Sequence, residues 1–207
     1  MPQSVWVLRG RPISLFEFTF GLSAVILGLA LTHLAGCYHR LAMAGRRVKW
    51  AAEPVLLSGI IFLVIVSVWL FQWPDRISTH TTIGLMLLQV AKLLLPYLAA
   101  AFVLPENVPE EGEVDLLAHY DRTRAFTFGA LIAGLLLFWV AAGIKRSVTA
   151  GGVDLWGELS RAPWLFVSVY LILIFVRARW LNILLLTAAL LYYGWGIIGV
   201  PLQENLP

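Results

Sequence analysis

Residues 16–40 read FEFTFGLSAVILGLALTHLAGCYHR, an apolar stretch with one carboxylate near its start and Arg40 at its end. The hydrocarbon core of a bilayer is about 30 Å thick, and a helix of about 20 apolar residues crosses it. The stretch is therefore long enough to span a membrane as a helix. We predict that it is the first of six such helices in the chain.

The apolar stretches together predict an all-α fold, a polytopic membrane protein with six transmembrane helices bundled in a single domain. The helices are expected at residues 15–40, 54–73, 79–104, 125–144, 163–176 and 180–200, with an acidic loop at 105–124. Only residues 177–179 separate the last two helices, and so short a link predicts an antiparallel hairpin.

The composition places the chain in lipid. Hydrophobic residues make up 60% of the sequence and charged residues 13%, far from the balance of a soluble domain. The net charge of +3 comes from basic residues near helix ends, which is typical of membrane topology signals rather than nucleic-acid binding. We therefore expect a lipid bilayer, and no nucleic acid, as the partner of this chain.

The basic residues also predict an orientation. With the N-terminus outside, the inner links carry eight basic residues, and the outer segments carry six. The inner ones are Arg40, Arg46, Arg47, Lys49, Arg122, Arg124, Arg177 and Arg179. The charge count thus favours an orientation with the N-terminus outside. We expect the membrane to be a bacterial inner (plasma) membrane.

Small residues recur every four positions along the first helix and share one of its faces: Ala24, Gly28, Thr32 and Gly36. Small side chains let another helix approach closely, which is how helices associate in lipid. The pattern is typical of packing within the chain, and it also fits a helix that lines a pore or joins copies of the protein.

Lys92 is expected near the middle of the third helix, too deep for its side chain to reach water at either membrane surface. Gln89 precedes it by three residues on the same face. The first and third helices run the same way, so Thr32 and His33 are expected at a similar depth. We predict a transport or polar centre of Lys92, Gln89, Thr32 and His33, with a structural hydrogen-bond cluster as the alternative.

Charged residues also gather where the first helix begins and the third is expected to begin. They are Glu17, Asp75, Arg76 and His80. A carboxylate at this end could attract cations or pair with an arginine, although a solvated carboxylate at a helix start is equally typical.

The segment before the fourth helix contains Glu111, Asp115 and His119, which a helix would place on one face. Carboxylates with one imidazole can bind a divalent cation, but such a run is more typical of a solvated acidic surface, so no metal is predicted. His33, His39 and His119 gather toward one end, yet no convincing pair of haem ligands emerges. We therefore predict no cofactor, with haem as a minor alternative.

Residues Leu34-Ala35-Gly36-Cys37 match the processing site of a bacterial lipoprotein. Processing there would place the basic residues that follow the first helix on the outer side, against the charge rule. We therefore expect Cys37 to be a packing residue.

Six short-linked helices in about 200 residues resemble the bacterial and lysosomal potassium-channel family with a Phe-Ser-Asp motif on its first helix. Phe20 precedes a small-residue run ending at Thr32, and the third helix contains Leu93-Leu94-Leu95-Pro96-Tyr97. The resemblance implies an oligomer in which Phe20, Ala24, Gly28 and Thr32 face the conduction path. Residues 20–22 read Phe-Gly-Leu, without the serine and aspartate of the motif. The chain also resembles bacterial six-helix membrane proteins with a Gly-Leu-Ala-Leu-Thr first helix.

The sequence predicts a homo-oligomeric channel or transporter for a small ion or solute, with the first helix lining the path. A lysine at mid-depth favours anions or protons over potassium. The alternatives are a non-catalytic membrane subunit or scaffold that binds partner helices, and a haem or quinone redox protein. No HExxH, GxSxG, phosphate-loop or paired CxxC motif occurs, so we do not expect an enzyme.

Overall fold

The computed structural model describes residues 15–72, 83–109, 112–152 and 154–198. Seven α-helices, one 3₁₀ turn and two short strands occur in these ranges. In chain order they are α1 (Leu15–Ala44), η1 (Gly45–Arg47), β1 (Val48–Lys49), α2 (Ala52–Leu70), α3 (Ile83–Val103), β2 (Val114–Asp115), α4 (Leu116–Ala150), α5 (Leu155–Ser160), α6 (Trp164–Phe175) and α7 (Arg179–Ile198). The predicted all-α class is confirmed.

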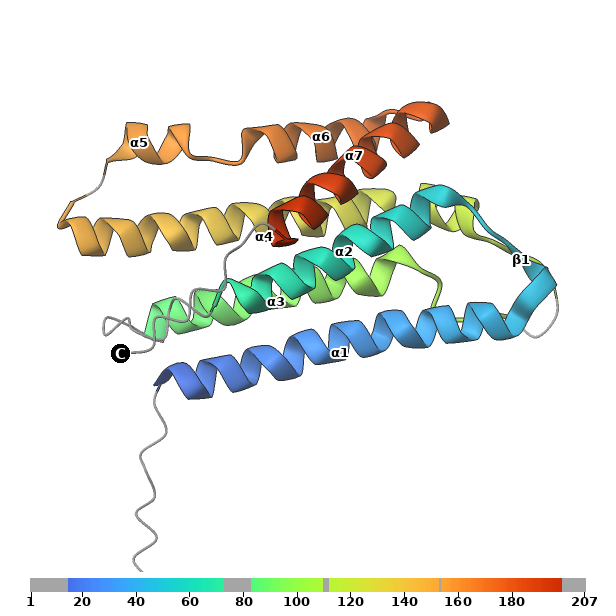
Figure 1. Ribbon diagram of the computed structural model, residues 1–207, viewed down its shortest axis with the longest axis horizontal. Coiled ribbons are helices and arrows are strands. Elements are labelled where there is room, and N and C mark those ends of the chain that lie inside the picture. The colour runs from blue at the N-terminus through green and yellow to red at the C-terminus, as the bar shows by residue number, and fades with distance from the viewer. Residues whose placement is uncertain (1–14, 73–82, 110–111, 153, 199–207) are drawn as a thin grey trace, which may run out of the picture.

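The long helices run side by side along the long axis of the molecule, with α1 at one edge and α5 and α6 at the opposite edge (Figure 1). Helix α3 packs between α1 and α4, α2 packs against α7, and α4 packs against α6. The buried core runs through the middle of the bundle, and its largest fully buried side chains include Tyr120, Tyr170 and Phe128.

Four of these helices are long and apolar enough to cross a membrane: α1, α2, α4 and α7. Two shorter apolar helical segments, Leu87–Val103 in α3 and Trp164–Phe175, accompany them. Helices suit apolar sequence in lipid because they satisfy every backbone polar group internally. The predicted count of six crossings is therefore supported for four helices by length and composition.

Helix α4 begins earlier than the sequence predicted. The expected acidic loop at 105–124 gives way to helix at Leu116, and the helix continues to Ala150 instead of ending near residue 144. The side chain of Asp115 starts it by accepting hydrogen bonds from the amides of Leu117, at 2.9 Å, and Ala118, at 3.0 Å. Gly151, at φ 71°, ends it in the left-handed conformation that glycine favours.

The remaining boundaries differ by a few residues. Helix α1 runs to Ala44 instead of 40, α2 spans Ala52–Leu70 instead of 54–73, and the start expected at 79 for the third helix lies outside the described residues. The link expected after the fourth helix contains a short helix, α5, which Asp154 begins by accepting from the amide of Gly157. Such short helices carry too little apolar sequence to be predicted as spans.

A two-residue parallel ladder joins two links that are far apart in sequence. Val48 pairs with Val114, and Lys49 pairs with Asp115. Lys49 also forms an ion pair with Glu113. Because β1 precedes α2 by only two residues and β2 leads directly into α4, the ladder fixes the starts of these two helices beside each other at one end of the bundle.

Candidate functional site

Lys92 lies near the middle of α3, nine residues after the helix begins and eleven before it ends. At 1.5 Å per residue these separations are about 13 and 17 Å, farther than a lysine side chain extends. The residue is only 8% exposed. The burial of Lys92 inside the bundle agrees with the sequence prediction, which left a functional and a structural role open.

A cavity of about 160 Å³ lies beside Lys92. Apart from Pro96 of α3 and Phe71 just after α2, its neighbours come from α2, α4, α6 and α7, so the cavity lies among five helices of a single chain. The lining is mostly apolar, and its polar side chains are Lys92, Ser67, Tyr170 and Tyr193. Such a volume has room for a few water molecules or one small anion.

An aromatic ring contacts the ammonium group, and two phenols line the same cavity. Lys92 Nζ lies 4.9 Å from the centroid of the Phe138 ring on α4, within the range of a cation–π contact. The hydroxyls of Tyr170 and Tyr193 lie 3.1 Å apart on the same cavity. The cavity therefore combines one cationic donor with two hydroxyls that bond each other.

Gly134 of α4 lies against α3 at this level, with room for a Cβ atom in ordinary van der Waals contact. A Cβ atom added to Gly134 would lie 3.4 Å from Leu95 Cβ and 4.0 Å from Pro96 Cδ. Pro96 has no amide hydrogen, so the carbonyl of Lys92 one turn earlier lacks its usual helical donor.

The structure places the other members of the predicted polar centre elsewhere. Thr32 is exposed, and its hydroxyl donates to the carbonyl of Gly28 at 2.8 Å. His33 Nε2 lies 3.5 Å from Cys37 Sγ, on the same helix. Gln89 is half-buried one turn before Lys92, and the α3 residues that line the cavity are Lys92 and Pro96. Lys92 is therefore joined at the cavity by residues of α2, α4, α6 and α7.

The small-residue face of α1 points away from the bundle. Ala24 and Thr32 are exposed, and Gly28 and Gly36 are half-buried. The opposite face of α1, which contacts α3 and α2, contains the buried residues Ser23, Leu27, Ala30, Leu34, Cys37 and Leu41. Packing within the chain therefore uses other residues than the predicted face, and Cys37 is a buried free thiol.

Of the charges predicted to gather at the start of the first helix, Glu17 lies in the first turn of α1 and is exposed. Asp75, Arg76 and His80 lie outside the described residues. The grouping of these four charged residues therefore stays a prediction.

The predicted metal candidates have structural roles where they are described. Asp115 caps α4, and His119 bonds through Nε2 to the carbonyl of Phe102 at 3.0 Å. Glu111 lies outside the described residues, and within those described no cluster of three or more His, Cys, Asp or Glu side chains occurs. His39 is exposed, while His33 contacts Cys37.

No protein-family model, no curated protein and no solved structure matches this chain. The resemblance to the potassium-channel family therefore stays a prediction. In the structure, the ring of Phe20 packs against Trp69 of α2 with 5.5 Å between centroids.

Sequence reasoning missed Ser67, Phe138, Tyr170 and Tyr193 as companions of Lys92. Each is a single polar or aromatic residue within an apolar stretch, a pattern that also occurs in ordinary membrane helices. The available signal was their position near the middle of an apolar stretch, where a hydroxyl needs a partner inside the protein. The partners of Lys92 also depend on which helices pack together, and that pairing could not be predicted from the sequence.

Proposed function

We propose that this chain is an integral membrane protein that moves a small anion across the membrane through the cavity at Lys92. The observation that carries the proposal is a buried ammonium group, 8% exposed, on a cavity of about 160 Å³ at mid-helix depth. Keeping a charge there is costly, and a role in moving an opposite charge is the usual reason for it.

Six crossings fit this proposal. Helix α3 has 21 residues, long enough at 1.5 Å per residue for a bilayer core of about 30 Å. Helix α6 supplies the fifth crossing at Trp164–Phe175, and α5 lies in line with it beside α4 (Figure 1). By the charge rule the N-terminus is outside, and the expected membrane is a bacterial inner membrane.

The proposed path lies inside one protomer instead of along α1. Its lining comes from α2, α3, α4, α6 and α7. The exposed small-residue face of α1 is then available for association between copies, which suits a homo-oligomer. A non-enzymatic transporter needs no reactive residues beyond this lining.

Flux into proteoliposomes tests the proposal. Wild-type protein is expected to admit chloride or nitrate in preference to potassium, and Lys92→Met to lower anion flux at least about tenfold, because a single buried charge sets the field in the cavity. Methionine keeps the length and apolar stem of the side chain. Lys49→Met is the matched control, since Lys49 is exposed at the end of the bundle and away from the cavity.

Equal and negligible flux from wild type and Lys92→Met would contradict permeation.

The second candidate, a membrane scaffold that binds helices of another protein, is favoured by the outward small-residue face of α1. Cross-linking of the Ala24→Cys variant tests whether this face binds a second copy or a different protein. Disulfide formation between copies in membranes supports self-association, whereas absence of cross-links with no flux favours a scaffold for a different protein.

A further inference from the structure

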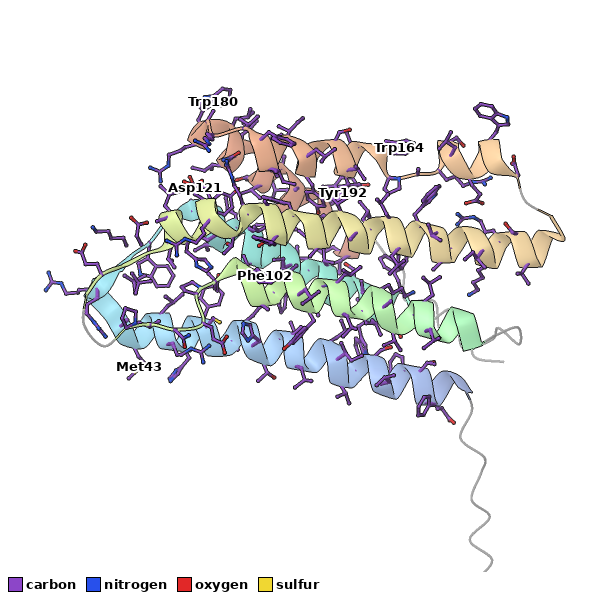
Figure 2. The ribbon with its side chains drawn as sticks, turned by 180° about the vertical axis from the view of Figure 1, so that it is seen from behind. Met43, Phe102, Asp121, Trp164, Trp180 and Tyr192 are labelled. Atoms are coloured by element: carbon purple, nitrogen blue, oxygen red, sulfur yellow. The ribbon has the colours of Figure 1, made fainter. Side chains whose placement is uncertain are left out.

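A second cavity, of about 340 Å³, lies at the end of the bundle where α2, α4 and α7 begin. Its lining is strongly polar and includes Glu53, Tyr120, Arg124, Arg177, Arg179 and Asn182. Asp121 adds a second carboxylate. Figure 2 shows Asp121, near the start of α4, and Trp180, near the start of α7, at the same end of the molecule.

The parallel strands explain why these residues meet. Val48 pairs with Val114, which places the starts of α2 and α4 side by side. Glu53 and Tyr120 each follow their strand by a few residues and so reach a similar depth. Arg179 then joins α7 to α2, because its Nε donates to Glu53 Oε1 at 3.2 Å.

Three residues that line this cavity each have a buried polar atom with no hydrogen-bond partner among the described residues. The atoms are Glu53 Oε2, Tyr120 Oη and Asn182 Oδ1. The three residues are 1%, 1% and 3% exposed. Leaving a buried polar atom without a partner is unfavourable, so three such atoms in the residues of one cavity point to a bound group that satisfies them. Two of the three are acceptors, and that group must therefore donate hydrogen bonds.

The same cavity also favours an anion. Three guanidinium groups face two carboxylates, which leaves an excess of one positive charge. Arg124 is engaged with the carbonyl of Val176 at 3.3 Å and with Asp121 at 3.6 Å, whereas Arg177 is exposed at the rim. The planar fork of a guanidinium matches the oxygens of a phosphate.

Exposed tryptophans lie at the level of this cavity. Trp50, just before α2, is 52% exposed, and Trp180, the second residue of α7, is 71% exposed. Tryptophan is enriched at the boundary between the hydrocarbon core and the headgroups of a bilayer. In the proposed membrane the cavity lies where phospholipid headgroups are found.

We propose that this cavity binds a phosphate ester that also carries a hydrogen-bond donor, an ammonium or hydroxyl group. The phosphate lies against Arg177 and Arg179, and the donor reaches Glu53 Oε2 and Asn182 Oδ1. A phospholipid headgroup and a free phosphate ester share this chemistry. Binding here is independent of flux through the Lys92 cavity, so the failure of one leaves the other measurable.

Binding to the purified, delipidated full-length chain in dodecyl maltoside tests the proposal. The probes are dihexanoyl phosphatidylethanolamine, whose ammonium donates, and dihexanoyl phosphatidylcholine, whose quaternary ammonium does not. We expect the first to bind at least about tenfold more tightly, since a hydrogen bond to a charged group contributes at least that factor. Ligand-dependent thermal shift or native mass spectrometry measures the ratio.

Two variants test the hydrogen-bond donor and the phosphate of the ligand separately. Glu53→Gln keeps the side-chain shape and is expected to bring the ratio between the lipids close to one. Arg177→Gln, at an exposed position, is expected to weaken both lipids by about tenfold, because each has the phosphate. Arg122→Gln is the matched control, an exposed arginine of α4 that does not line the cavity.

Glycerophosphoethanolamine, which lacks acyl chains, identifies the source of the ligand. Competition by it assigns the site to the phosphate ester itself, and failure to compete while the lipid preference persists assigns it to the membrane lipid. The proposal is overturned if the two lipids bind equally to wild type, or if Arg177→Gln binds as wild type does. In either case the cavity is a water-filled polar space.

Discussion

The hydroxyl of Tyr170 on α6 lies 3.1 Å from the hydroxyl of Tyr193 on α7, beside the cavity that contains Lys92. Tyr170 is 1% exposed, and its ring packs against Phe128 of α4 with 5.8 Å between centroids. The two phenols thus join the last two helices at the level of the candidate site.

Replacing one phenol should destabilise the protein. Tyr193→Phe removes the partner of the buried Tyr170 hydroxyl and is expected to lower the free energy of unfolding by about 1–3 kcal/mol. Equilibrium unfolding in mixed detergent measures it. Tyr192→Phe is the matched control, because Tyr192 is 61% exposed and adjacent in sequence. Equal effects of the two variants would show that the hydrogen bond contributes nothing.

The two faces of α1 should respond differently to added bulk. Ala30 is fully buried against the bundle, so Ala30→Leu is expected to cost about 1–3 kcal/mol through overpacking. Ala24→Leu, on the exposed small-residue face, should leave the unfolding of the monomer unchanged. If Ala24→Leu destabilises as much as Ala30→Leu, the packing face has been assigned to the wrong side.

The N-terminus of α4 depends on one carboxylate. Asp115→Ala deprives the amides of Leu117 and Ala118 of their acceptor and is expected to cost about 1 kcal/mol. Asp115→Asn keeps an oxygen at the cap and should restore most of that loss. Thermal unfolding of the two variants beside wild type measures the difference, and an equal loss in both would point to the charge instead of the cap.

Glu158 should make the end of α4 sensitive to acid. Its carboxylate accepts from Arg146 Nε at 2.8 Å and from Arg161 Nη1 at 3.3 Å. The hydrogen bond from Arg146, with the charges of both arginines, lowers the pKa of Glu158 below its ordinary value of 4.5. A lowered pKa means that this contribution to stability is present above 4.5 and is lost as the pH falls through the pKa of the folded state.

Hydrogen exchange of the α5 segment measures that loss. Amides of Leu155–Ser160 are expected to exchange faster, relative to their intrinsic rates, once the pH drops below the lowered pKa. Glu158→Gln should show the faster exchange already at neutral pH and no acid step. An acid step of the same size in the variant would assign the titration to another group.

Much of the fold was predictable because apolar length is a strong signal. Lipid demands about 20 apolar residues for each crossing, so α1, α2 and α7 were found within a few residues. The start of α4 was missed because residues 116–124 mix apolar and charged side chains. Leu116 and Tyr120 are buried, whereas Asp121 and Arg122 are exposed. On a helix this is one amphipathic face, but its charge made it read as a loop.

The sequence predicted how deep Lys92 lies along its helix, but not which neighbouring helix its side chain faces. The position of Lys92 in its apolar stretch predicted a buried ammonium. Its partners depend on which helix packs against which side of α3. The prediction paired Lys92 with Thr32 of α1, whereas the structure turns Lys92 toward α4, where Phe138 lies. Glu53 and Asn182 went unnoticed because single polar residues near helix ends are ordinary in sequence.

Because Val48 pairs with Val114, the number of residues between this strand and α2 determines where Glu53 lies. Only Trp50 and Ala51 separate the paired strand from α2. One residue inserted there would rotate Glu53 by about 100° around the helix axis, away from Arg179 and Asn182. A change in the spacing of this connection would therefore dismantle the arginine-rich cavity without replacing any of the side chains that form it.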